Sequence, residues 1–174
     1  MIPQRKRTAV GLLVLLAVVS LTTACPSSND LDKMAKASNE LAHDCVLANR
    51  TTAEVFKARD AALVAKEQTA RTAQEKAEIA ASRKSLLTSK DRIADKLGVI
   101  CEKGDKFNDF LIELDKKYPQ GTLPPQDLSL VKQNLSELRT LYADIVADLL
   151  PFGAQKAVSE LDKDLQTIEK VVNQ

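Results

Sequence analysis

The sequence predicts an all-α protein, and three observations support this. Residues 31–97 contain no Gly or Pro and consist mostly of good helix formers such as Ala, Lys, Glu, Gln, Arg and Leu. Apolar residues recur at 3-4 spacing over most of the chain, whereas the period-2 alternation of strands is absent. The 174 residues include no Trp, two Tyr and four Phe, which favours long helices that touch along narrow seams.

The first 25 residues have the pattern of an export signal. An uncharged apolar run over residues 9–21 follows three basic residues, Arg5, Lys6 and Arg7. A bilayer span needs about 20 apolar residues, so this run is too short to cross a membrane but suits a signal peptide. Ala24 followed by Cys25 resembles the lipobox of bacterial lipoproteins, although Thr22 stands where that family usually has Leu. The resemblance implies cleavage of residues 1–24, acylation of Cys25 and a short tether over 25–29. The alternatives are a plain secreted protein and an uncleaved anchor.

Removal of residues 1–24 would leave 22 basic and 24 acidic residues, a net charge of −2. This balance argues against a nucleic-acid partner, and no block of Lys and Arg marks an electrostatic membrane patch. We expect the lipid to be the membrane anchor of a protein that faces the periplasm. Pro26 stands where the best-known inner-membrane retention signal has Asp, which favours the outer membrane.

Residues 30–118 are expected to form a long helical hairpin. Its first seam is a 3-4 repeat that shifts by one position at Phe56, as in a stutter or a bend. The members of this seam are Leu31, Met34, Ser38, Leu41, Cys45, Ala48, Thr52, Val55, then Phe56, Leu63, Ala70 and Ala77. The second seam comprises Ile93, Leu97, Ile100, Gly104, Phe107, Leu111, Leu114 and Tyr118. Near the end of the first seam, Thr72 and Glu75 fit a capping box, which predicts a helix start near residue 72.

Cys45 and Cys101 are expected to form a disulfide, because an exported chain with two remaining thiols meets an oxidising compartment. A disulfide joins points at equal height on adjacent helices. The midpoint of the two cysteines is residue 73, so we favour helices near 30–70 and 73–118. The competing layout is one helix from 30 to about 87 with a turn at residues 85–89, which would set the cysteines many turns apart. Two unpaired, packed thiols are the other alternative.

The remaining sequence predicts a second, shorter hairpin over residues 126–174, in one domain with the first (30–174). Residues 119–125 (PQGTLPP) form the clearest loop, and residues 151–153 (PFG) break the next helix. Apolar residues recur at 3-4 spacing over 128–149 and 158–172, and we expect these helices to pack on each other and on the 93–118 helix. Leu135, Leu138 and Leu161 should be buried, whereas Glu137 and Lys163 should lie on polar faces.

The residues that carry chemistry are few. His43 is the single histidine, so neither a di-iron bundle site nor a usual nucleophile–His arrangement can be built. Glu40, His43 and Asp44 leave only a loose metal site conceivable, and a solvated helix face explains them better. The chain has no Gly-rich phosphate loop and no Cys-x-x-Cys motif. We therefore predict no enzyme activity, no cofactor and no metal.

These observations together predict a four-helix bundle with coiled-coil-like seams, tethered to the membrane by a lipid. The expected function is that of a structural or adaptor lipoprotein with a protein partner in the bacterial cell envelope. The alternative is a bundle that binds a small apolar or lipid ligand between its helices. A deep cavity lined by Leu and Phe would favour the ligand, and a filled core with an exposed apolar stripe would favour the adaptor.

Overall fold

The computed structural model describes residues 28–173, so the predicted signal peptide and Cys25 lie outside the described residues. The described chain forms four α-helices, with two short 3₁₀ turns between the last two helices, and the all-α prediction is confirmed. The elements are α1 (Ser28–Thr69), α2 (Ala73–Lys117), α3 (Pro125–Leu149), η1 (Leu150–Phe152), η2 (Gln155–Val158) and α4 (Ser159–Val172). None of these helices is long and apolar enough to cross a bilayer.

The turn between α1 and α2 lies at residues 70–72, as the capping box predicts, and the competing turn at residues 85–89 is wrong. The backbone N–H of Glu75 donates to Thr72 Oγ1 at 3.1 Å, and the backbone N–H of Thr72 donates to Glu75 Oε2 at 3.0 Å. Arg71 adds a third backbone N–H to the same carboxylate at 2.8 Å. These N–H groups lower the pKa of Glu75, because they stabilise its ionised form.

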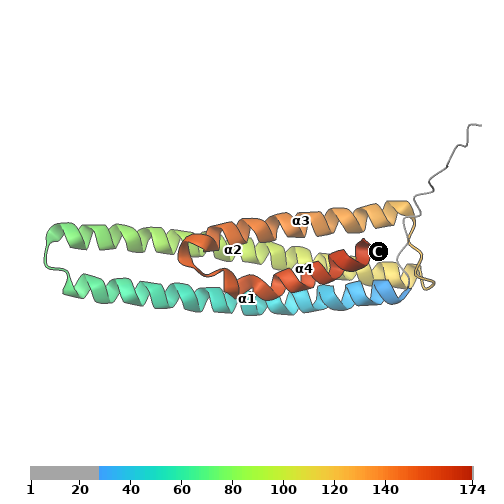
Figure 1. Cartoon of the computed structure of the whole chain (residues 1–174), viewed down its shortest axis with the longest axis horizontal. Coiled ribbons are helices and arrows are strands. Elements are labelled where there is room, and N and C mark those ends of the chain that lie inside the picture. The colour runs from blue at the N-terminus through green and yellow to red at the C-terminus, as the bar shows by residue number, and fades with distance from the viewer. Residues whose placement is uncertain (1–27, 174) are drawn as a thin grey trace, which may run out of the picture.

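The four helices run alternately up and down around a filled core (Figure 1). The two hairpin seams meet each other, and Phe107 and Leu111 are buried, as are Leu31 and Met34 at the start of α1. Leu41 packs on Gly104, where an added Cβ would stand 3.5 Å from its side chain. Leu135, Leu138 and Leu161 are at most 5% exposed, which confirms their predicted burial.

The last helix is placed differently from the expectation. α3 packs on α2, as predicted, whereas α4 packs mainly on α1 and then on α3. In a ring of four antiparallel helices each helix touches two neighbours, and α4 closes the ring between α3 and α1. The link between α3 and α4 turns at Pro151 and at Gly153, whose φ of 56° is a left-handed conformation that glycine adopts without strain.

The helices differ greatly in length, and this difference creates the most distinctive part of the molecule. α1 and α2 contain 42 and 45 residues, but α3 and α4 contain only 25 and 14. At 1.5 Å per residue the first hairpin is roughly 60 Å long, so the shorter helices leave one end of it uncovered. We call this uncovered two-helix segment, residues 57–85, the arm. It lies at the end of the molecule opposite the start of α1 (Figure 1).

Candidate functional site

The arm exposes most of its side chains to solvent. None of its residues is buried, and the half-buried apolar side chains are Leu63, Val64, Ala70 and Ile79. This agrees with the sequence, in which residues 66–84 contain one large apolar residue, Ile79. Because the two helices contribute so little core there, the arm depends on helix propensity, the capping box and ion pairs.

An ion-pair cluster joins the two helices within the arm. Arg83 on α2 donates to both oxygens of Asp60 on α1, at 2.8 and 3.2 Å, and lies 3.5 Å from Glu67. The guanidinium group lowers the pKa of Asp60 by hydrogen bonding to its ionised form. Two of the four acidic residues of the arm are therefore paired inside the arm itself.

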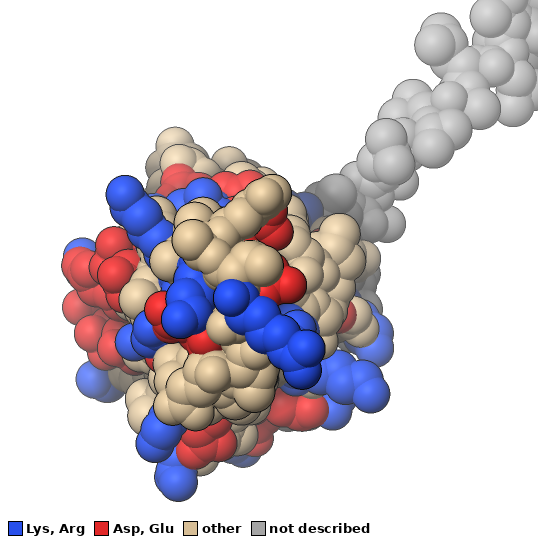
Figure 2. All heavy atoms as spheres, turned by 90° about the vertical axis from the view of Figure 1, so that its left-hand side faces the viewer, with Lys and Arg blue, Asp and Glu red and all other residues tan. Residues whose placement is uncertain are grey.

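Basic residues outnumber acidic residues in the arm by seven to four. In the rest of residues 25–174 the ratio is 15 basic to 20 acidic, so the arm is the basic part of an otherwise acidic chain. Lys57, Lys66, Arg71, Lys76 and Lys84 are exposed. Figure 2 looks at the arm end of the molecule, and Lys and Arg side chains extend across the surface nearest the viewer. This end would therefore attract acidic groups at ionic strengths that do not screen them.

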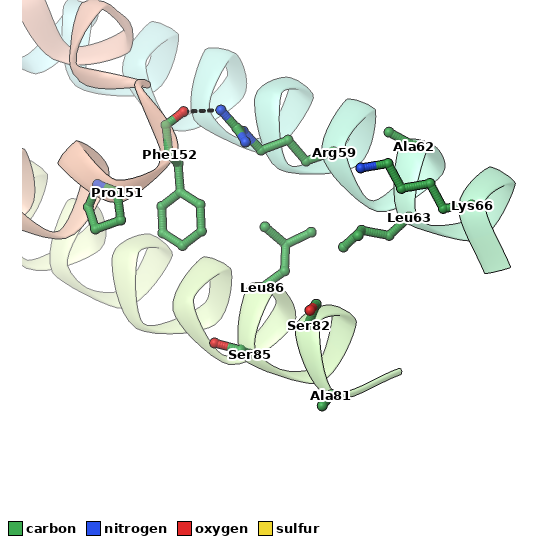
Figure 3. A pocket seen from close by; sticks show the side chains of 10 residues that line it. All are labelled: Arg59, Ala62, Leu63, Lys66, Ala81, Ser82, Ser85, Leu86, Pro151 and Phe152. Atoms are coloured by element: carbon green, nitrogen blue, oxygen red, sulfur yellow. Dashed lines mark hydrogen bonds between the residues drawn. The ribbon is translucent and has the colours of Figure 1, made fainter. Parts of the chain in front are cut away.

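A groove of about 590 Å³ lies where the arm leaves the four-helix body (Figure 3). We call it the arm groove. Its lining residues are Arg59, Ala62, Leu63 and Lys66 on α1, Ala81, Ser82, Ser85 and Leu86 on α2, and Pro151 and Phe152 from η1. The groove thus has an apolar floor between two helices, with the cations Arg59 and Lys66 beside it.

Phe152 closes the body end of the arm groove. Its ring packs against the ring of Phe56 with a centroid separation of 4.9 Å. The guanidinium group of Arg59 donates to the backbone carbonyl of Phe152 and lies 6.0 Å from the centre of its ring. These contacts fix the link between α3 and α4 onto α1 and so define where the covered hairpin ends and the arm begins.

Cys45 and Cys101, far apart in the sequence, lie beside one another on α1 and α2 and line one surface groove. Both are thiols in this structure. A hydrogen bond between the thiols, together with burial, raises the pKa of Cys45, and the same hydrogen bond lowers the pKa of Cys101. The turn at residues 70–72 makes this approach possible, and the disulfide itself stays a prediction.

A second buried group was not expected from the sequence. Asp164 on α4 is only 8% exposed, and its Oδ2 atom has no hydrogen-bond partner among the described residues. Burial, together with the nearby carboxylates Asp44, Glu40 and Glu160, raises the pKa of Asp164 to about 6. The sequence did offer a signal, because Asp164 follows Leu161 by three residues and precedes Ile168 by four, which places it on the apolar face of α4.

The other residues considered for chemistry lie on the surface. Glu40 and His43 are exposed on α1, and Asp44 is half-buried near Asp164. Across residues 28–173 no group of three or more His, Cys, Asp or Glu side chains is placed to hold a metal ion. The geometry of the described chain therefore directs attention to surfaces, above all to the arm and its groove.

Comparisons of the chain with protein-family models, with curated proteins and with solved structures found no match.

Proposed function

We propose that this protein is a non-enzymatic adaptor of the bacterial cell envelope, anchored by a lipid on Cys25 and presenting its arm to a partner. The observation on which this proposal depends is that the start of α1 and the arm lie at opposite ends of the molecule. α1 starts at one end, immediately after the predicted tether, and the arm forms the other end (Figure 1). A lipid on Cys25 would hold the first end at the membrane and direct the arm away from it.

The packing of the bundle favours an adaptor over a container for a small apolar ligand. Large apolar side chains fill the interior along the whole four-helix section, including Phe107, Leu97, Ile145 and Leu165. The arm groove is partly open to solvent, whereas sites for small molecules usually enclose most of the ligand. An exposed surface of apolar and basic side chains on a projecting arm suits contact with another macromolecule.

The anchor is tested by substituting the acylated residue. In cells that process lipoproteins, the unchanged protein should sediment with membranes and resist extraction at high salt. The variant Cys25→Ser should appear as a soluble or an unprocessed form, because it lacks the thiol that carries the lipid. Cys101→Ser, which removes a different thiol, is the matched control and should stay in the membrane fraction. A Cys25→Ser protein of mature length that still sediments with membranes would contradict the proposal.

A further inference from the structure

The apolar seam of the arm continues a surface that is already an interface in the body. In the body, α3 and α4 cover the α1–α2 hairpin, and this covering ends at Phe152. Beyond Phe152 the same two helices continue, and no other segment of residues 28–173 covers them (Figure 1). A second hollow of about 300 Å³ shares Lys66 with the arm groove and extends toward the tip, lined by Thr69, Ala70, Arg71, Glu75 and Ile79.

The small side chains of the arm allow close approach of another helix. Ala62 and Ala81 face the arm groove from opposite sides, with Leu63 and Leu86 between them (Figure 3). The arm groove has an apolar floor and runs parallel to two helices. This shape accepts the apolar face of an amphipathic helix.

The charges beside the arm groove determine which charge a partner must carry to bind there. Arg59 and Lys66 flank the arm groove, and none of its lining residues is acidic. All four acidic residues of the arm have partners within the arm: Asp60 and Glu67 pair with Arg83, Glu75 accepts backbone N–H groups, and Glu78 accepts a hydrogen bond from Gln74. Lys66 forms no ion pair within residues 28–173, so its ammonium group can meet a carboxylate of another molecule.

From this geometry we infer that the arm groove binds an acidic amphipathic helix of a partner protein, which extends the bundle along α1 and α2. This inference rests on the proposed adaptor role, whose partner it describes. A second copy of the arm is a poor occupant, because both arms carry a net positive charge. After the proposed cleavage, only three residues would precede α1, too few to reach the arm from the opposite end of the molecule (Figure 1).

The test uses the unlipidated chain that starts at residue 26 and contains every helix of the structure. The probe is a synthetic peptide of about 18 residues, long enough to span the arm groove at 1.5 Å per residue. It carries Leu at 3-4 spacing, Glu on the flanks and one Trp on the apolar face. Because the protein has no Trp, the fluorescence of the peptide reports binding directly. A scrambled peptide of equal composition and a peptide with Lys in place of Glu are the controls.

Matched variants locate the binding surface. Ala62→Glu and Lys66→Glu change the lining of the arm groove and should weaken binding of the acidic peptide by about tenfold or more. Ala61→Glu and Lys57→Glu make the same exchanges at exposed arm positions outside the groove, and should change binding by less than about twofold. All four positions are exposed, so the variants should fold, and circular dichroism checks this.

Several results would overturn the inference. The scrambled peptide could bind as tightly as the patterned one, or all four variants could weaken binding equally, which would indicate unspecific charge attraction. Binding of dodecanoate that is lost in Ala62→Glu, without binding of the peptide, would identify a lipid site. Concentration-dependent dimerisation that is lost in Ala62→Glu would identify a second copy as the occupant. Because the assay needs no lipid, its failure leaves the anchoring of Cys25 standing, and failure of acylation leaves the peptide result unaffected.

Discussion

Asp164 lies in an unusual environment for an aspartate. Its carboxyl group is buried where α4 packs against α1 and faces Asp44 and Glu40 across that interface, with Glu160 and Lys163 on its own helix. Burial in a medium of lower dielectric and the repulsion of like charges both oppose ionisation. The α1–α4 contact is therefore weaker when this carboxyl group is ionised.

The direction of the pH effect follows from the raised pKa. The folded state keeps the Asp164 proton up to about pH 6, whereas the unfolded chain releases it near 3.8. The free energy of unfolding should fall as the pH rises through this interval and level off above it. Asp164→Asn removes the ionised form and should stabilise the protein by about 1–2 kcal/mol near pH 7.5, with little change near pH 4. Thermal melts at the two pH values measure this.

Asp109→Asn provides the control for this prediction, because it removes one negative charge from an exposed position on α2. It should leave the melting temperature nearly unchanged at both pH values. A gain in stability for Asp164→Asn that is equal at the two pH values, or a loss at neutral pH, would show that ionisation of the buried carboxyl group is not what limits the α1–α4 contact.

The pairing of Cys45 and Cys101 can be tested in the exported protein. After export, Cys45 and Cys101 should be joined by a disulfide, because the turn at residues 70–72 brings their helices together at equal height. In the chain-entropy model a loop of this length gives about 4 kcal/mol of stabilisation, an upper value if the bond is strained. Peptide mapping without reductant should recover a linked pair of peptides. Recovery of two free thiols, or of a dimer linked through these residues, would refute the intramolecular bond.

The clean 3-4 repeats of α3 and α4 predict a core in which shortening a side chain is costly. Leu138 is 1% exposed and Leu161 is 0% exposed. Replacing either with Ala should cost about 2–5 kcal/mol through lost apolar contact and the cavity left behind. That is a large part of the roughly 5–15 kcal/mol of a typical domain. Denaturant unfolding of the chain from residue 26 measures the loss.

Lys163 and Glu137 are the controls for these core positions. Their side chains are 68% and 45% exposed, and their ion pairs with Glu160 and Lys103 lie at the surface. Such pairs contribute little, so each Ala variant should change the free energy of unfolding by about 0.5 kcal/mol or less. If Leu138→Ala and Leu161→Ala unfold like the unchanged protein, the seams would not be the core, contrary to the structure.

Local patterns predict most of the elements but not how they are assembled. The capping box of Thr72 and the midpoint between Cys45 and Cys101 agree on one turn, and the loop at 119–125 contains residues that cannot continue a helix. The side of the bundle on which α4 lies depends instead on the geometry of the η1–η2 link. The arm groove could not be predicted, because Phe152 enters it from a distant segment. Periodicity along one helix gives no information on such a contact.

The two ends of the long axis of the molecule differ in both structure and charge. One end is formed by the start of α1 and by the loop between α2 and α3, and the other is the basic arm (Figures 1 and 2). The body between them is acidic, so the attraction for an acidic partner is concentrated at the end farthest from the predicted anchor. An adaptor with this arrangement would reach roughly 60 Å from its tether, the length of α1.

The intact mass of the protein extracted from membranes shows whether a lipid fixes its mature N-terminus to the membrane. We expect a chain that starts at Cys25, cut between Ala24 and Cys25, with the added mass of acyl groups. Fragmentation should place all of the added mass on the first residue. An unmodified chain that starts at Cys25, or a chain that retains Met1, would show that the protein has no such lipid anchor.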